Sequence, residues 1–184
     1  MANPRIHKAF LACAFVSAFA AAAASAQTGN RPPTPAQTEG PYFKAGSPER
    51  RSLRQAGVAG VPLRLTGKVI DLAGKPVPGA RLEFWQADGE GRYDNSGFTL
   101  RGHQFADGEG RYLLDTVLPA RYLNRASHIH VKVIVGGKPP LTTQLYFAGE
   151  SGNESDPLVD ARLTVVLTDG PEGKAGAFDF TLNF

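Results

Sequence analysis

Short stretches in which apolar and polar residues alternate, separated by Gly, Pro and Asp, follow one another from Val61 to the end of the chain. In residues 80–85, for example, Leu82 and Phe84 alternate with charged residues, as in a strand with one buried face. Turn residues recur roughly every 8–12 residues, and helical periodicity is nearly absent. We therefore predict an all-β fold, a β-sandwich of mainly antiparallel strands with an irregular N-terminal arm. The predicted strands are residues 63–70, 80–85, 110–116, 128–135, 142–147, 162–168 and 177–183, the first two joined by a tight turn.

The first 26 residues differ from the rest of the chain. Arg5 and Lys8 precede an apolar, Ala-rich run that ends in Ala24-Ser25-Ala26. This order is typical of a secretory signal peptide, and the run is too short for a membrane span. We therefore predict that residues 1–26 are a signal peptide and that the protein is exported, to the periplasm or outside the cell.

The remaining chain divides into an arm and a domain. Residues 27–60 are rich in Pro and Gly and are predicted to be an irregular N-terminal arm. Within the arm, residues 47–60 carry a dense group of charges with a weak helical pattern, which indicates a surface segment. Residues 61–184 hold all the predicted strands and form the predicted β-sandwich domain.

Composition restricts the classes of partner. The chain has 184 residues, 42% of them hydrophobic and 20% charged, which suits one globular domain. Loss of Arg5 and Lys8 with the signal peptide reduces the net charge from +3 to +1, and no cluster of basic and aromatic residues indicates nucleic-acid binding. The single cysteine, Cys13, is lost as well, which excludes disulfides and Cys-ligated metals. We expect a small-molecule partner, and no membrane partner after signal cleavage.

The segment Tyr122–His130 concentrates reactive side chains, with a phenol, a guanidinium and two imidazoles in nine residues. In a strand that begins at His128, both imidazoles would lie on one face and Ile129 and Val131 on the other. The two imidazoles are therefore a candidate pair of metal ligands. A half-exposed strand with two polar residues accounts for the same pattern, so the interpretation depends on other residues.

Residues 88–93 and 107–112 have the same sequence, Asp-Gly-Glu-Gly-Arg-Tyr. Asp-Gly-x-Gly commonly forms a turn, and the flanking sequences differ, so we interpret both copies as turns rather than as an internal repeat. Neither copy is followed by the regular series of carboxylates that a calcium loop requires.

Several spaced motifs together resemble one enzyme family. The pattern running from Leu65-Thr66-Gly67-Lys68-Val69 to Gly91-Arg92-Tyr93 resembles the signature segment of the intradiol ring-cleavage dioxygenases, the protocatechuate and catechol dioxygenase family. Tyr122, Arg125, the His128-Ile129-His130 motif and residues 143–147 follow in the family's order. The resemblance covers roughly residues 34–150.

This resemblance implies a non-haem Fe(III) cofactor. By motif, the metal ligands would be Tyr93, Tyr122, His128 and His130. Phenolates are hard anionic donors that suit a ferric ion, and the charge of the ion keeps them deprotonated.

The resemblance also implies a reaction and assigns further residues to it. A catechol-type substrate would be cleaved with O2 to a cis,cis-muconate-type dicarboxylic acid, in catabolism of aromatic compounds by the catalytic domain 61–184. Tyr122 would leave the metal and act as a base, Arg125 would stabilise charge on the substrate, and Gln144 would be a hydrogen-bond partner of substrate or oxygen. Tyr42 lies in a segment that the family often brings near its pocket.

The chain also departs from the family pattern. Only a short segment without Trp separates Tyr122 from His128, and the helical dimerisation domain of the catechol branch is absent from residues 27–60. The substituents of the substrate and the oligomeric state, including a possible homo-oligomer, stay open.

Three other residues have alternative interpretations. Trp85 is interpreted as a core residue or a pocket wall. Tyr112 shares the Gly-Arg-Tyr context of Tyr93 and could replace it as a ligand. His103 is expected at the surface or in a loop.

Other classes of protein contain parts of these patterns. The stretch from Val69 to Leu82 also suits a non-catalytic, transthyretin-like or carboxypeptidase-regulatory-like β-sandwich that serves as a binding module. Such a module has no need of two tyrosines and a His-x-His motif in ligand order. A cupin-type metal site requires a carboxylate shortly after its His-x-His motif, and residues 131–138 contain none.

Overall fold

The computed structural model describes residues 31–184, so the predicted signal peptide lies outside the described residues. Strands dominate this part of the chain, and its one helical element is a 3-10 turn, η1 (Ala161–Leu163). The strands are β1 (Pro62–Asp71), β2 (Arg81–Gln86), β3 (Arg101–Phe105), β4 (Arg111–Val117), β5 (His128–Ile134), β6 (Leu141–Phe147), β7 (Thr164–Val165), β8 (Thr168–Gly170), β9 (Gly173–Ala177) and β10 (Phe180–Leu182). No helix of residues 31–184 is long and apolar enough to span a membrane.

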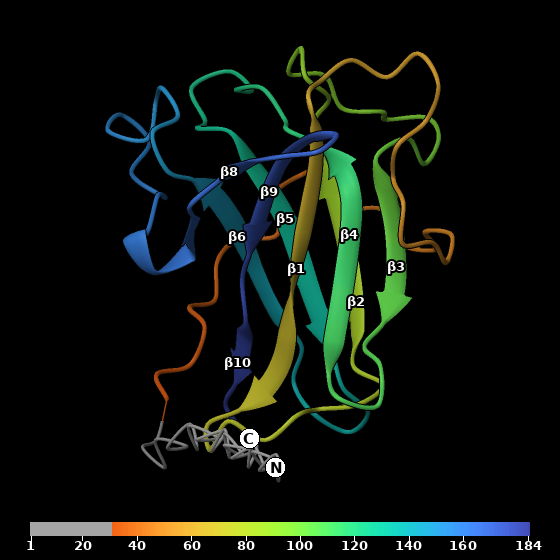
Figure 1. Cartoon of the computed structure of the whole chain (residues 1–184), viewed down its shortest axis with the longest axis vertical. Helices are drawn as coiled ribbons and strands as arrows, with labels where there is room; N and C mark the ends of the chain where they lie inside the picture. The colour runs from red at the N-terminus through yellow and green to blue at the C-terminus, as the bar shows by residue number, and fades with distance from the viewer. Residues whose placement is uncertain (1–30) are drawn as a thin grey trace, which may run out of the picture.

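The strands form two sheets that face each other (Figure 1). One sheet has the order β3-β2-β5-β6-β7; the other has the order β10-β1-β9-β8, with β4 also paired to β1. Pairing is antiparallel except where β1 meets β9 and β10 and where β6 meets β7. The predicted all-β sandwich of mainly antiparallel strands is confirmed.

The hydrophobic core lies between the two sheets. Leu65 and Leu114 contribute from one sheet, and Phe84, Ile129 and Val131 contribute from the other; each is at most 1% exposed. Because side chains alternate along a strand, β5 turns Ile129 and Val131 into the core and His128 and His130 to the outer face of the sheet. The predicted division of β5 into an imidazole face and an apolar face is confirmed.

The irregular arm, residues 31–60, precedes β1 in the chain and is orange in Figure 1; its first part runs along this outer face and covers it. The Gln37 N–H donates to the Thr142 carbonyl of β6 at 2.8 Å. Lys132, on β5, forms an ion pair with Glu39 and lies 3.8 Å from the centre of the Phe43 ring. The arm therefore buries side chains that a two-layer sandwich would leave exposed.

The weak helical pattern of residues 47–60 was misleading, because the segment forms no helix and pairs with strands at two positions, Glu49 with β3 and Ser52 with β4. The Arg50 N–H donates to His103 O at 2.8 Å, and the Leu53 N–H donates to Asp115 O at 2.7 Å. Leu53 is fully buried, so part of this charged segment belongs to the core. His103 lies on β3 rather than in a loop, half-buried, with its Nδ1 2.9 Å from the Ser47 carbonyl.

Three other predictions of elements were wrong in detail. The first two strands do not form a hairpin, since β1 and β2 lie in different sheets. β3 was not predicted, because its sequence, Arg-Gly-His-Gln-Phe, has almost no apolar pattern. Each predicted strand after residue 160 is divided into shorter elements, with breaks at residues 166–167 and 178–179.

The two Asp-Gly-Glu-Gly-Arg copies form the same turn, as predicted. Asp88 Oδ1 accepts the backbone N–H groups of Glu90 and Arg92 at 2.9 Å each. Asp107 Oδ1 accepts those of Glu109 and Arg111 at the same distances. The first turn leads to Tyr93, and the second leads into β4.

Candidate metal centre

The candidate site lies at the end of the sandwich where β2 and β6 end and β5 begins. The loops between β2 and β3, between β4 and β5, and between β6 and η1 gather at this end (Figure 1, top). His128 is the first residue of β5, and its neighbours across the sheet are β2 and β6. Rigid strands therefore hold the imidazoles, whereas loops supply the tyrosines.

The two imidazoles point their Nε2 atoms towards each other, with the ring planes at 77°. The Nε2 atoms of His128 and His130 are 3.1 Å apart, and the side chains are 4% and 2% exposed. His128 Nδ1 is 2.6 Å from the Ala126 carbonyl, so the proton is assigned to Nδ1 and the Nε2 lone pair is free. Burial lowers the pKa of His128 to about 4 and that of His130 well below its ordinary value. Both rings are neutral at pH 7, the form that binds a metal.

Packing holds the ring of His130. Trp85 stacks on it with ring centres 4.9 Å apart and an angle of 6° between the planes. Gly40 of the arm covers it so closely that a Cβ there would lie 3.3 Å from His130 Cε1. His130 Nδ1 is buried and has no hydrogen-bond partner among residues 31–184. Trp85 is thus both a buried residue and a wall of the site.

Tyr93 reaches the imidazoles from the loop after β2, with its hydroxyl 3.3 Å from His128 Nε2. Burial raises the pKa of the Tyr93 phenol well above its ordinary value, and the positive charges of Arg125 and Arg101 oppose that rise. A cation at the site would do the same more strongly, because a phenol in a dry pocket ionises only beside positive charge. Tyr112, the alternative ligand, donates to the Phe178 carbonyl at 2.9 Å inside the other sheet.

Tyr122 completes an aromatic cluster with Tyr93 and Tyr42. The Tyr122 ring meets the Tyr93 ring edge to face, with centres 5.4 Å apart. Tyr42 stacks on Tyr93 at 4.4 Å, and its hydroxyl shares a hydrogen bond with the Tyr122 hydroxyl. The structure therefore brings Tyr93, His128 and His130 together directly. It places Tyr122 beside Tyr93, with its hydroxyl held by the arm.

Arg125 and Gln144, both predicted to contact the substrate or oxygen, are in direct contact with each other. Arg125 Nη2 donates to Gln144 Oε1 at 2.6 Å, and Gln144 Nε2 donates to the Thr38 carbonyl of the arm at 2.9 Å. Arg125 Nε donates to Asp156 Oδ2 at 2.8 Å, and the Tyr146 hydroxyl accepts from Nη2 at 3.1 Å. These bonds fix the direction of the guanidinium.

Two residues of the site were missed in the sequence. Asp156 has a fully buried carboxylate and also accepts the Ala126 N–H at 2.8 Å, two residues before His128. Arg101 is 2% exposed and donates to the backbone carbonyls of Asp94 and Tyr42. Neither belongs to a local motif, and only their contacts in the fold connect them to the site.

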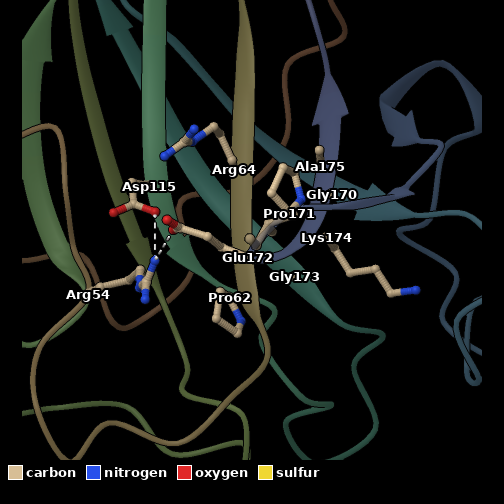
Figure 2. Close-up of a pocket in the computed structure, with 11 residues that line it drawn as sticks. Arg54, Pro62, Arg64, Asp115, Gly170, Pro171, Glu172, Gly173, Lys174 and Ala175 are labelled. Carbon is tan, nitrogen blue, oxygen red and sulfur yellow. Dashed lines mark hydrogen bonds and ion pairs between the residues drawn. The ribbon is translucent and has the colours of Figure 1, made fainter.

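Of two pockets considered for the substrate, one borders the candidate site and the other does not. A cavity of about 340 Å³ borders Tyr93, between the loop after β2 and residues 57 and 58. A second pocket, of about 100 Å³, lies on the other sheet between β1, β4 and the β8–β9 turn, where Arg54 pairs with Asp115 and Glu172 (Figure 2). Its lining contains neither His nor Tyr, so it is not part of the candidate metal centre.

The donor set fits a ferric ion. Two neutral imidazoles present their Nε2 atoms to one point, and a phenol oxygen lies beside them with a second phenol next to it. In residues 31–184 no group of three or more His, Cys, Asp or Glu side chains could hold a metal. A metal at this site would therefore need the tyrosines as ligands, and hard phenolate oxygens favour Fe(III).

Comparison with known proteins shows which family the chain resembles. A dioxygenase family model (Dioxygenase_C) matches residues 38–183. A catechol 1,2-dioxygenase from Pseudomonas sp. (strain EST1001) is 32% identical over 155 residues, which cover 70% of this chain and 51% of that protein. A hydroxyquinol 1,2-dioxygenase from Nocardioides simplex is 30% identical over 157 residues, which cover 72% of this chain and 54% of that protein. The chain spans about half the length of these relatives.

Solved structures show the same fold. The dioxygenase domain of a dioxygenase carbohydrate-binding protein fusion from Streptomyces sp. SirexAA-E superposes with a TM-score of 0.80 at 49% identity, covering 83% of this chain and 99% of that one. For 3-chlorocatechol 1,2-dioxygenase from Rhodococcus opacus 1CP, the TM-score is 0.76 at 27% identity, with 86% and 75% of the chains covered. With its two-sheet fold and its clustered tyrosines and histidines, the chain belongs to the intradiol ring-cleavage dioxygenase family.

Proposed function

We propose that this protein is a non-haem Fe(III)-dependent enzyme that cleaves a catechol-type ring with O2 to a cis,cis-muconate-type dicarboxylic acid. The observation that supports this most directly is the clustering of three donor atoms around His128, whose Nε2 lies 3.3 Å from the Tyr93 hydroxyl and 3.1 Å from His130 Nε2. Tyr122 is proposed as the fourth ligand. When bound, ferric iron would supply the Lewis acidity that holds the substrate as its dianion and makes the ring reactive towards oxygen.

Tyr122 is proposed as the base. Its hydroxyl lies within hydrogen-bond distance of the Tyr42 hydroxyl, so a position outside the metal site is available to it. A Tyr122 phenolate that moves to this position takes a proton from the substrate hydroxyl onto its Oη atom, and Tyr42 then holds the resulting phenol. The same side chain thereby serves as ligand and as base.

Arg125 is proposed to stabilise negative charge on the ring. Its guanidinium is already oriented by Asp156 and Gln144, so little reorganisation is needed when charge develops. Its side chain is 25% exposed, whereas His128 and His130 are almost completely buried. The site thus presents one cationic face to the substrate and keeps water from the imidazoles.

The cheapest test is colour. Tyrosinate ligands give ferric proteins a visible charge-transfer band, so the purified protein should be red with about one iron per chain. The His128→Gln substitution, which keeps a polar side chain, should abolish both colour and iron. A wild-type protein that stays colourless and free of iron after reconstitution would contradict the metal site and support the non-catalytic binding module.

Oxygen uptake tests the reaction. Similar proteins are named as catechol, hydroxyquinol and chlorocatechol 1,2-dioxygenases, so the substrate panel should contain these three classes of ring. Ring-opened dicarboxylic acids with matching oxygen consumption would support intradiol cleavage. Extradiol products, or no uptake with any catechol, would contradict it.

We also propose that the enzyme acts after export. The support is the order of basic residues, apolar run and Ala24-Ser25-Ala26 at the N-terminus. N-terminal sequencing of the protein from the periplasm or the medium should begin at Gln27. Recovery of the uncleaved chain from the cytoplasm alone would refute this.

A further inference from the structure

Arg101, the first residue of β3, contacts two separate segments of the site. Its Nε and Nη2 atoms donate to the Asp94 carbonyl at 3.1 and 3.0 Å, directly after Tyr93 in the chain. Its Nη1 atom donates to the carbonyl of Tyr42, in the arm. One side chain therefore joins the loop that carries Tyr93 to the arm that carries Tyr42.

The bonding of Arg101 is unusual for a buried guanidinium, because its acceptors in residues 31–184 are backbone carbonyls. The nearby Asp94 carboxylate is already occupied by the backbone N–H groups of Ser96, Gly97 and Thr99. Burial of a charge without an ion pair is costly.

We propose that Arg101 is a positioning residue for the metal site: it fixes the arm against the Tyr93 loop, so that Tyr42 and Tyr93 stay stacked at 4.4 Å. The inference rests on the proposed ferric site. Arg101 would hold Tyr93, one proposed ligand, and Tyr42, the hydrogen-bond partner of the proposed ligand Tyr122, at fixed relative positions. Lys44 supports the same contact from the surface by donating to the Ser96 carbonyl at 2.6 Å.

Arg50 offers a matched control. It is also a partly buried arginine that bonds to backbone carbonyls, with Nε donating to Arg101 O at 2.9 Å and Nη2 donating to Phe98 O. Its hydrogen bonds reach neither Tyr42 nor Asp94. Arg101→Met and Arg50→Met thus each remove a guanidinium that bonds to backbone carbonyls. Arg50 joins the arm to the far end of the Tyr93 loop, at Phe98, whereas only Arg101 bonds to Asp94, next to Tyr93, and to Tyr42.

The primary measurement uses metal-free protein, so that it does not depend on iron. Trypsin cleavage after Lys44, followed by mass spectrometry, reports how firmly the arm is held. Arg101→Met should accelerate this cleavage about tenfold, as expected for the loss of a charge-assisted hydrogen bond. Arg50→Met should change it less than about twofold. Arg101→Lys, which keeps the charge but not the forked donors, should give an intermediate rate.

The second measurement uses iron-loaded protein. Arg101→Met should shift the visible charge-transfer band and make the iron about tenfold easier to remove with a chelator. Arg50→Met should leave both unchanged.

Wild-type cleavage rates in Arg101→Met and Arg101→Lys, or equal acceleration by Arg50→Met, would overturn the proposal. If Arg101→Met does not fold, the Arg101→Lys rate decides. A wild-type protein without iron would refute the proposed function, whereas the cleavage comparison would still decide whether Arg101 positions the arm.

Discussion

Gly91 brings the two tyrosine-bearing segments together, and replacing it with alanine tests how the metal centre is assembled. Its φ is +77°, and a Cβ at this position would lie 2.3 Å from the Arg121 carbonyl oxygen. Tyr93 follows two residues later, and Tyr122 is the neighbour of Arg121. The absence of a side chain at Gly91 therefore allows the Tyr93 loop to pack on the backbone that leads into Tyr122.

The cost of Gly91→Ala follows from these two observations. The left-handed backbone conformation costs a non-glycine residue about 1–2 kcal/mol. Relief of the 2.3 Å contact requires a shift of the backbone, for which overpacking costs of about 1–3 kcal/mol are typical. Together they predict a loss of about 2–5 kcal/mol in the free energy of unfolding.

The chain supplies its own control in the second copy of the same turn. Gly110 has a φ of +72°, and a Cβ there would lie 2.6 Å from the Val69 carbonyl oxygen. This turn joins β3 to β4 at the opposite end of the sandwich from the metal centre (Figure 1). Gly110→Ala should therefore destabilise the fold by a similar amount without moving either tyrosine.

Urea unfolding, followed by fluorescence of the single tryptophan, Trp85, measures stability in both variants. Chelator competition and visible absorption measure the metal centre. We expect both variants to lose stability, but only Gly91→Ala to bind iron more weakly and to change colour. Equal iron binding in the two variants, or wild-type stability of Gly91→Ala, would refute the reasoning.

Three further predictions concern the ionisable residues. Burial lowers the pKa of His128 from 6.5 to about 4, so the unfolded chain takes up a proton at a higher pH than the folded chain. The urea midpoint of the metal-free protein should therefore fall as the pH drops from 6.5 towards 4. An equally steep decline in a His128→Gln variant would contradict this. Asp156→Asn should cost about 1–3 kcal/mol in urea unfolding and lower kcat with iron retained, because Arg125 loses its ion pair and the amide offers one acceptor oxygen where the carboxylate offers two; unchanged kcat would show that the ion pair does not orient Arg125. Tyr122→Phe should reduce oxygen uptake much more than iron content, and complete loss of iron would indicate a purely structural ligand.

The parts of the fold that could be predicted are those in which local pattern and burial agree. β5 has a fully apolar face and a polar face, so its strand, its histidine pair and the direction of both faces were all readable. β3 could not be read, since its side chains are Arg, Gly, His, Gln and Phe and its position is fixed by pairing with β2 and by the arm. The weak helical pattern at residues 47–60 was overridden by backbone pairing with β3 and β4.

The candidate site shows the same division. The motifs around Tyr93 and His128 pointed to residues that the structure brings together, because candidate metal ligands are particular side chains at particular spacings. Asp156 and Arg101 support the site through contacts with Arg125, Asp94 and the arm, and these contacts depend on tertiary structure alone. Residues that act through another residue leave little trace in a local pattern.

The arm that closes the site has a consequence for the order of folding. Its contacts join residues far apart in the chain: Thr38 with Gln144, 106 positions apart, and Gln37 with Tyr146, 109 positions apart. The arm contacts side chains of both β5 and β6, so its docking surface exists only once these two strands have paired. We therefore expect the arm to dock last, after the sandwich has formed, so that the open outer face of β5 gives a newly made chain a period in which iron can enter before the site is covered.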